Sequence, residues 1–180
     1  TEVLQLGVKI ASALETAHRA GLLHRDIKPS NILVTTFGAP VLSDFGIAAA
    51  VRAASEEPLT DPGFAVGTPA YMSPEQSAGE AVDARSDIYA LGCVLYEMLA
   101  GEPPYTGATA LAIRARQAME TVPRLRTVRD TVPEGVEGAI RTALAKVSAD
   151  RFPTVDEFVT RLTHHDAVKP LARTVAVLSL

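Results

Sequence analysis

The chain has 180 residues, of which 47% are hydrophobic and 21% are charged, and its formal net charge is -4. This composition excludes a disordered chain, and the length is sufficient for one domain with a buried core. Neither the charge nor any apolar run predicts a nucleic-acid surface or a membrane-spanning segment, so we expect neither partner. The single cysteine, Cys93, lies in an apolar helical pattern and is predicted to be a buried thiol.

The first predicted element is an amphipathic helix from Glu2 to Ala20, where apolar residues recur at helical spacing. Gly21 is well placed as its left-handed C-cap. His18 and Arg19 lie in the last turn of this helix. We interpret them as surface residues that complement the helix dipole rather than as ligands.

Residues 24–31, with the sequence His-Arg-Asp-Ile-Lys-Pro-Ser-Asn, concentrate polar side chains between two apolar segments. The carboxylate of Asp26 can accept a proton from a hydroxyl, and the ammonium of Lys28 can neutralise charge on a phosphoryl group. The amide oxygen of Asn31 can hold a hard cation such as Mg²⁺. Pro29 favours the tight turn that would bring these groups together. Each residue alone would be interpreted as part of a polar loop, but the set predicts phosphoryl chemistry.

Two short strands are predicted next, at residues 32–34 and 41–42, joined by a turn. The triplet Asp44, Phe45 and Gly46 follows the second strand. A hairpin of this kind would bring the carboxylate of Asp44 beside residues 24–31. Asp-Phe-Gly alone is a weak motif, but its position directly after the hairpin strengthens it.

On these two motifs the chain resembles the eukaryotic-type (Hanks-type) serine/threonine protein kinases, and its Ala-rich composition is similar to bacterial members. The resemblance implies that Asp26 accepts the substrate proton and that Lys28 neutralises the transferred phosphoryl group. It implies further that Asn31 and Asp44 hold Mg²⁺ on the phosphates of ATP, to which Lys28 also binds. His24, Arg25 and Phe45 then have structural roles.

Residues 44–75 correspond to the activation segment of this family. Between Ile47 and Val66 the pattern is that of a loop. By position, Ser55 and Thr60 become candidate phosphorylation sites, and a phosphate there could bind Arg25.

The end of this segment, residues 67–75, resembles the substrate-docking loop of the family. Its last triplet is Ser-Pro-Glu where the family has Ala-Pro-Glu, a change in a small side chain that we expect to be tolerated. Thr68 corresponds to the residue that lies near the catalytic Asp and Lys in the serine/threonine branch. Together with Lys28, it implies hydroxyl substrates on Ser or Thr.

A nearly uniformly apolar helix is predicted from Ser86 to Ala100, with Gly101 as its end. Ser86 or Asp87 is the expected N-cap. The resemblance also implies that Asp87 binds the backbone of the catalytic loop.

Three further helices are predicted, at residues 108–119, 134–145 and 154–162. Thr154 is expected to cap the last of them, with Glu157 completing a capping box. Just before it, Arg151 corresponds to the late arginine of the family, which implies an ion pair with Glu75.

The resemblance covers residues 1–163 and only the larger lobe of a kinase. The expected fold is therefore mainly α: a protein-kinase-like large (C-terminal) lobe, built as a helical bundle with a short catalytic-site β-hairpin. The small N-terminal lobe is missing, since neither G-x-G-x-x-G nor the V-A-I-K lysine occurs. Residues 164–180 match nothing in the fold and are interpreted as a tail or linker to a further region.

The function implied is transfer of the γ-phosphoryl group of ATP to Ser or Thr hydroxyls of proteins, with ATP and Mg²⁺, in the cytoplasm. These 180 residues alone are expected to be inactive unless another copy supplies the missing half in a homodimer. Two alternatives stay open: a non-catalytic kinase-like scaffold and a small-molecule phosphotransferase. The retention of Asp26, Lys28, Asn31 and Asp44 argues against the scaffold. The docking segment and the implied Glu75–Arg151 pair argue against the phosphotransferase.

Overall fold

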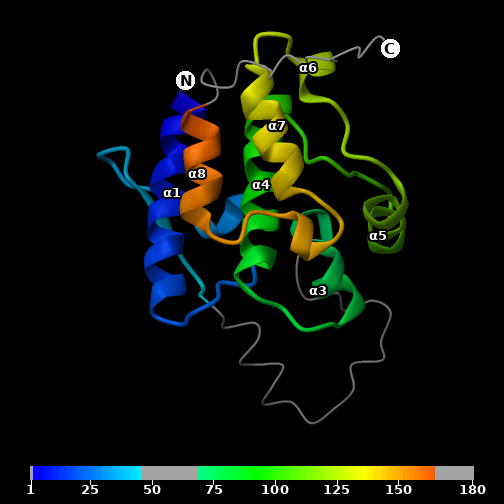
Figure 1. Cartoon of the computed structure of the whole chain (residues 1–180), viewed down its shortest axis with the longest axis horizontal. Helices are drawn as coiled ribbons and strands as arrows, with labels where there is room; N and C mark the ends of the chain where they lie inside the picture. The colour runs from blue at the N-terminus through cyan, green and yellow to red at the C-terminus, as the bar shows by residue number, and fades with distance from the viewer. Residues whose placement is uncertain (1, 46–68, 165–180) are drawn as a thin grey trace, which may run out of the picture.

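The structure is a computed structural model that describes residues 2–45 and 69–164. Its central element is helix α4 (Ala84–Ala100), which is buried on all sides from Ser86 to Tyr96. Helices α1 (Glu2–Arg19), α7 (Glu134–Ala143) and α8 (Val155–Thr163) pack around it or around one another (Figure 1). This arrangement confirms the mainly α fold class.

Helix α4 begins earlier than the sequence pattern predicted. Its N-cap is Asp83, whose side chain accepts a hydrogen bond of 2.8 Å from the Arg85 amide. The expectation of a cap at Ser86 or Asp87 was therefore wrong. Since Asp83 already caps the helix, Ser86 and Asp87 lie inside the first turn, and their side chains are free to bind other segments.

Helix α1 ends as predicted. Gly21 has φ +75°, and the amides of Gly21 and Leu22 donate to the carbonyls of His18 and Ala17, both at 2.9 Å. This is a Schellman motif, which satisfies the last carbonyls of the helix and reverses the chain direction. The chain then enters residues 24–31 from the C-terminal end of α1.

The catalytic-loop sequence leads through a single 3₁₀ turn, η1 (Pro29–Asn31), into a two-stranded antiparallel sheet. Strand β1 (Ile32–Val34) pairs with β2 (Pro40–Leu42), with Ile32 opposite Leu42 and Leu33 opposite Val41. Leu42 is buried, and β2 packs against α1. The hairpin is thus fixed on the lobe at its β2 side.

The remaining elements are short or lie at the periphery: η2 (Pro69–Tyr71), α3 (Pro74–Ala78), α5 (Ala110–Met119), α6 (Leu125–Val128) and η3 (Ser148–Asp150). Helix α5 packs against η2 and α3. The Thr154 hydroxyl caps α8 by accepting from the Glu157 amide at 3.2 Å, whereas the reciprocal bond from the Glu157 side chain is not seen within the described residues. No helix in the ranges 2–45 and 69–164 is long and apolar enough to cross a bilayer.

Candidate active site

The loop of residues 24–31 is held in place by a buried carboxylate at the start of α4. Asp87 is 1% exposed, and its two oxygens accept hydrogen bonds from the backbone amides of His24, at 2.8 Å, and Arg25, at 2.7 Å. The predicted contact between Asp87 and the catalytic-loop backbone is therefore formed. A carboxylate buried in this way needs donors for its lone pairs, and the loop supplies two of them.

A third donor to Asp87 comes from α1. The Nε2 atom of His18 lies 2.8 Å from Asp87 Oδ2. Our interpretation of His18 as a surface residue was wrong, because the side of the last turn of α1 that carries His18 faces the start of α4. Arg19, in contrast, is exposed as expected and pairs with Glu15 and Asp156.

Two residues of the site have a left-handed backbone. Arg25 has φ +65° and Asp44 has φ +62°. For a residue with a Cβ this conformation costs about 1–2 kcal/mol, and it persists only where the surroundings fix it. At Arg25 the hydrogen bond from its amide to Asp87 contributes to that fixation, while its side chain stays exposed.

The three polar side chains predicted to act together in the loop do converge. Lys28 Nζ lies 2.8 Å from Asp26 Oδ2. The amide nitrogen of Asn31 donates to the Asp26 carbonyl at 2.8 Å and to Asp26 Oδ2 at 3.1 Å. Asn31 is 6% exposed, whereas Asp26 and Lys28 are partly open to solvent. Because the nitrogen of the Asn31 amide is committed to Asp26, its oxygen is the atom left for a cation.

Asp44 lies at the same end of the hairpin as Asn31. The Ser43 amide donates to the Asn31 carbonyl at 2.9 Å, which continues the pairing of β1 and β2 by one step. The Ser43 hydroxyl donates to Asp44 Oδ2 at 3.1 Å. Ser43 therefore links the two predicted metal ligands, a role that the sequence analysis missed although Ser43 directly precedes Asp44.

The aromatic ring of His24, in the loop, packs against that of Phe45. Their ring centroids are 4.5 Å apart, and His24 is fully buried. His24 Nδ1 accepts a hydrogen bond of 3.3 Å from the backbone amide of Asp26. The ring therefore contacts the backbone of the residue that is expected to accept the proton. These contacts fit the structural roles that we predicted for both residues.

The oxygen ligands of this site fit Mg²⁺ bound to a nucleoside triphosphate. Mg²⁺ prefers oxygen ligands, and protein sites commonly supply one or two carboxylates while phosphate oxygens and water complete the shell. Asp44 supplies a carboxylate and Asn31 an amide oxygen. The described residues contain no group of three or more His, Cys, Asp or Glu side chains placed to hold a metal ion.

An exposed apolar pair lies next to this polar group. Leu33 and Val41 face each other across the hairpin and are 55% and 46% exposed. The predicted pairing of the strands, together with the alternation of side chains along each strand, is the sequence signal that places them on the outer face. An apolar surface beside a phosphate site is suited to a flat base or to a covering domain.

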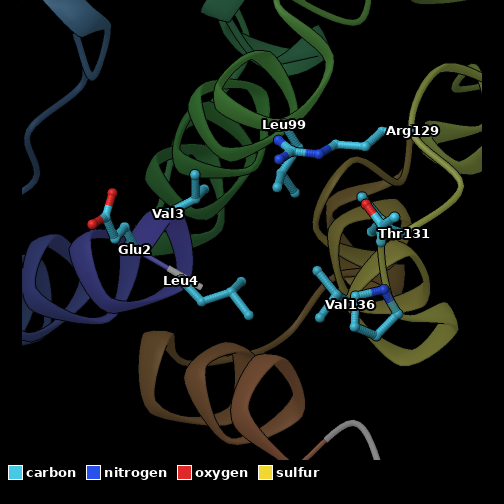
Figure 2. Close-up of a pocket in the computed structure, with 9 residues that line it drawn as sticks. Glu2, Val3, Leu4, Leu99, Arg129, Thr131 and Val136 are labelled. Carbon is cyan, nitrogen blue, oxygen red and sulfur yellow. The ribbon is translucent and has the colours of Figure 1, made fainter.

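A cavity of about 300 Å³ lies outside this site (Figure 2). It is formed by the start of α1 at Val3 and Leu4, the end of α4 at Leu99, and the segment that includes Arg129 and Val136. Helix α1 is about 27 Å long at 1.5 Å per residue, and its other end leads into the catalytic loop. The cavity is therefore separate from the proposed chemistry.

The predicted pair of Glu75 and Arg151 is formed and bidentate. Arg151 Nη1 lies 2.7 Å from Glu75 Oε1, and Nη2 lies 2.8 Å from Oε2. The Ser86 hydroxyl donates to Glu75 Oε1 at 2.5 Å. Burial alone would raise the pKa of Glu75, but the hydrogen bonds from Arg151 and Ser86 outweigh it and lower the pKa to about 2.

Ser73, where the family has Ala, has a local role. Its hydroxyl caps α3 by accepting from the Gln76 amide at 3.3 Å, and its own amide donates to Gln76 Oε1 at 3.0 Å. This reciprocal capping box satisfies two amides at the start of the helix. The departure from the family triplet is thus explained by helix capping, and Gln76 is a residue that the sequence analysis missed.

Two further contacts fix the segment before α3. The Tyr71 hydroxyl donates to Glu97 Oε2 at 2.7 Å. Gln117 is 1% exposed and donates from Nε2 to the carbonyls of Pro69, at 2.8 Å, and Met72, at 3.3 Å. Residues 69–75 are therefore held by α4, by α5 and by the Glu75–Arg151 pair. The remaining predicted residues, Gly46, Ser55, Thr60 and Thr68, lie outside the described residues.

Comparison with known proteins agrees with this geometry. A family model described as the protein kinase domain matches residues 1–169. The chain belongs to the protein kinase domain family. Its catalytic-loop residues, and Asp44 and Phe45 of the Asp-Phe-Gly triplet, lie at the places described above.

The curated relatives of this chain include bacterial proteins. A probable serine/threonine-protein kinase PknB of Corynebacterium glutamicum is 39% identical over 165 residues, covering 89% of this chain and 25% of the relative. A protein of the same name from Bifidobacterium longum is 42% identical over 172 residues, covering 95% and 24%. The serine/threonine-protein kinase PknL of Mycobacterium tuberculosis is 44% identical over 143 residues, covering 79% and 35%. The chain thus spans about a quarter to a third of the length of these relatives.

Proposed function

We propose that this chain is the large lobe of a serine/threonine protein kinase that transfers the γ-phosphoryl group of ATP to protein hydroxyls. The observation that carries the proposal is the convergence of Lys28 and Asn31 on Asp26, with Asp44 linked to Asn31 through Ser43. A carboxylate, an ammonium group and an amide in this arrangement are the parts that phosphoryl transfer requires from a large lobe.

In the proposed reaction the substrate hydroxyl oxygen forms a bond to the γ-phosphorus. The bond from that phosphorus to the bridging oxygen breaks, and the electron pair leaves with ADP. Asp26 accepts the proton of the hydroxyl. Lys28 neutralises charge on the phosphoryl oxygens, while Asn31 and Asp44 hold the cation. Bound Mg²⁺ supplies charge neutralisation on the phosphates.

The proposed substrate is a Ser or Thr residue of a protein. The printed names of the relatives describe serine/threonine-protein kinases, which supports this class. The rigid attachment of residues 69–75 suits the docking of an extended protein segment. The exposed pair Leu33 and Val41 suits contact with adenine or with a small lobe. We place the reaction in the cytoplasm, since ATP is the proposed phosphate donor and the free, buried thiol of Cys93 fits a reducing compartment.

The test is a phosphate-transfer assay on an intact kinase that joins this chain to a small lobe. Changing Asp26→Asn removes the proton acceptor and should lower kcat by about 10²-fold or more. Asp156→Asn is the matched control, because Asp156 is an exposed carboxylate on α8 whose ion pair, among the described residues, is with the exposed Arg19. The control should keep the parent's kcat.

Two results would contradict the proposal. Transfer that survives Asp26→Asn would show that Asp26 is not the proton acceptor. An intact kinase that phosphorylates small metabolites but no Ser or Thr peptide would replace the protein substrate with a small-molecule one.

A further inference from the structure

The side chain of Gln76 joins the substrate-docking segment to the catalytic loop. Gln76 lies in the first turn of α3, directly after Glu75 of the buried ion pair. Its Nε2 atom donates to the Arg25 carbonyl at 2.8 Å, across 51 positions of sequence. Its Oε1 atom accepts from the Ser73 amide at 3.0 Å. One amide therefore serves both as part of a helix cap and as a bridge.

The orientation of this amide is determined by its partners. Only an oxygen can accept from the Ser73 amide, and only an NH₂ group can donate to the Arg25 carbonyl. In a flipped amide, Oε1 would face the Arg25 carbonyl oxygen and the NH₂ group would face the Ser73 N–H, so neither pair could form a hydrogen bond. The position of α3 is set independently by the two hydrogen bonds between Arg151 and Glu75. Gln76 thus extends from a fixed support.

The bridge ends on the strained residue of the loop. Arg25 has φ +65°, and it directly precedes Asp26. Its amide donates to Asp87 Oδ1 at 2.7 Å, and its carbonyl accepts from Gln76. Both backbone polar groups of this left-handed residue are therefore held, one from α4 and one from α3. The direction in which the chain enters Asp26 depends on both contacts.

We propose that Gln76 is a positioning residue that fixes the orientation of Asp26 relative to the segment where the protein substrate docks. The inference rests on the proposed phosphoryl transfer. It adds a contact that couples the substrate-docking segment to the catalytic loop. The side chain of Gln76 donates to the Arg25 carbonyl and accepts from the Ser73 amide. It acts through the Arg25 carbonyl, so its loss should change the chemical step more than nucleotide binding.

The substitution Gln76→Glu separates the bridge from the cap. A glutamate still accepts from the Ser73 amide, and a negative charge in the first turn favours a helix. The donor to the Arg25 carbonyl is lost, and two acceptors then face each other. In the intact kinase we expect kcat to fall about tenfold, with the KM for ATP and the melting temperature kept.

A matched control addresses stability. Thr154→Ala removes the cap of α8, whose hydroxyl accepts from the Glu157 amide and not from the catalytic loop or α3, and should lower the melting temperature without lowering kcat. A second measurement does not depend on activity: amide hydrogen exchange of residues 24–28 in this 180-residue chain should become faster in Gln76→Glu.

The outcomes are distinguishable. Lower kcat together with faster exchange at residues 24–28 supports the inference. Unchanged exchange in Gln76→Glu overturns it, as does a kcat equal to that of the parent. If the parent itself transfers no phosphate to Ser or Thr, the proposed function fails, and the exchange measurement still decides the role of Gln76.

Discussion

Glu75 keeps its negative charge inside the lobe because Arg151 and Ser86 supply hydrogen bonds to both of its oxygens. Arg151 is 4% exposed and also donates to the carbonyls of Ala145, Lys146 and Arg85. This one guanidinium therefore connects α3, the start of α4 and the segment after α7. Its removal would leave a buried carboxylate without its main partner.

We predict that Arg151→Ala lowers the free energy of unfolding by about 3–5 kcal/mol at pH 7. Circular-dichroism melts of the chain measure this loss. Arg161→Ala, which removes an exposed arginine of α8, should leave the melt unchanged. A melt of Arg151→Ala equal to that of the parent would show that the ion pair does not support the lobe.

The Glu75–Arg151 pair also predicts how the loss of unfolding free energy in Arg151→Ala depends on pH. The pKa of Glu75 is lowered in the folded state from 4.5 to about 2. Between pH 4.5 and about 2 the carboxylate of Glu75 binds a proton more readily in the unfolded state than in the folded state. The contribution of Glu75 to the free energy of unfolding is therefore complete above about pH 4.5 and is lost as the pH falls towards 2. The difference in unfolding free energy between the parent and Arg151→Ala should therefore shrink between pH 5 and 2.

Among the elements, the contact of α1 with α4 sets the position of the catalytic loop, since α1 leads into the loop and α4 carries Asp87. The helices approach closely at Gly7. A Cβ added there would lie 2.6 Å from Leu95 Cδ2, and Leu95 is fully buried. Gly138 on α7 is different, because a Cβ there meets nothing within 4 Å.

These two glycines make a matched pair for an unfolding experiment. Gly138→Ala should raise the free energy of unfolding by about 0.5–1 kcal/mol, since it adds helix propensity without a clash. Gly7→Ala should lower it by about 1 kcal/mol, because the overpacking against Leu95 exceeds the gain in propensity. Urea unfolding of both variants checks the contrast, and equal stabilisation would mean that α1 and α4 are not tightly packed at Gly7.

At the scale of the whole molecule, the candidate site within the described residues is open to solvent on one side, because Asp26 and Lys28 are partly exposed. Asp26, Lys28, Asn31 and Asp44 lie at one end of the hairpin, beside the exposed pair of Leu33 and Val41. Residues 1–180 contain no G-x-G-x-x-G motif that would enclose the phosphates. Phosphoryl transfer depends on positioning and on electrostatics away from water, so a lobe alone should act poorly.

We therefore predict that the isolated chain shows no measurable heat of binding to Mg²⁺-ATP and no radiolabelled phosphate transfer to a basic protein. The calorimetric titration and the transfer assay use the same preparation. Transfer that disappears in Asp26→Asn would contradict this prediction. It would mean that the nucleotide is covered by another source, such as a second copy of the chain in a homodimer.

The sequence by itself determined the family and the helical fold class, and it predicted the candidate residues of the catalytic loop. The reason is that these depend on local patterns: apolar spacing for α1 and α4, turn residues for the hairpin, and fixed motif spacing for Asp26 to Asn31 and for Asp44. Gly21 and Gly101 as helix ends were predictable in the same way, since both have φ values that favour glycine.

Only the tertiary structure decided the contacts between distant segments that the family motifs do not imply. His18 donates to Asp87 because the last turn of α1 meets the first turn of α4, and Gln76 reaches Arg25 because α3 lies against the loop. Helical periodicity indicates which side of a helix is apolar, but a polar residue at its edge finds a partner only through packing. Such hydrogen bonds satisfy buried groups that no local pattern in the sequence identifies.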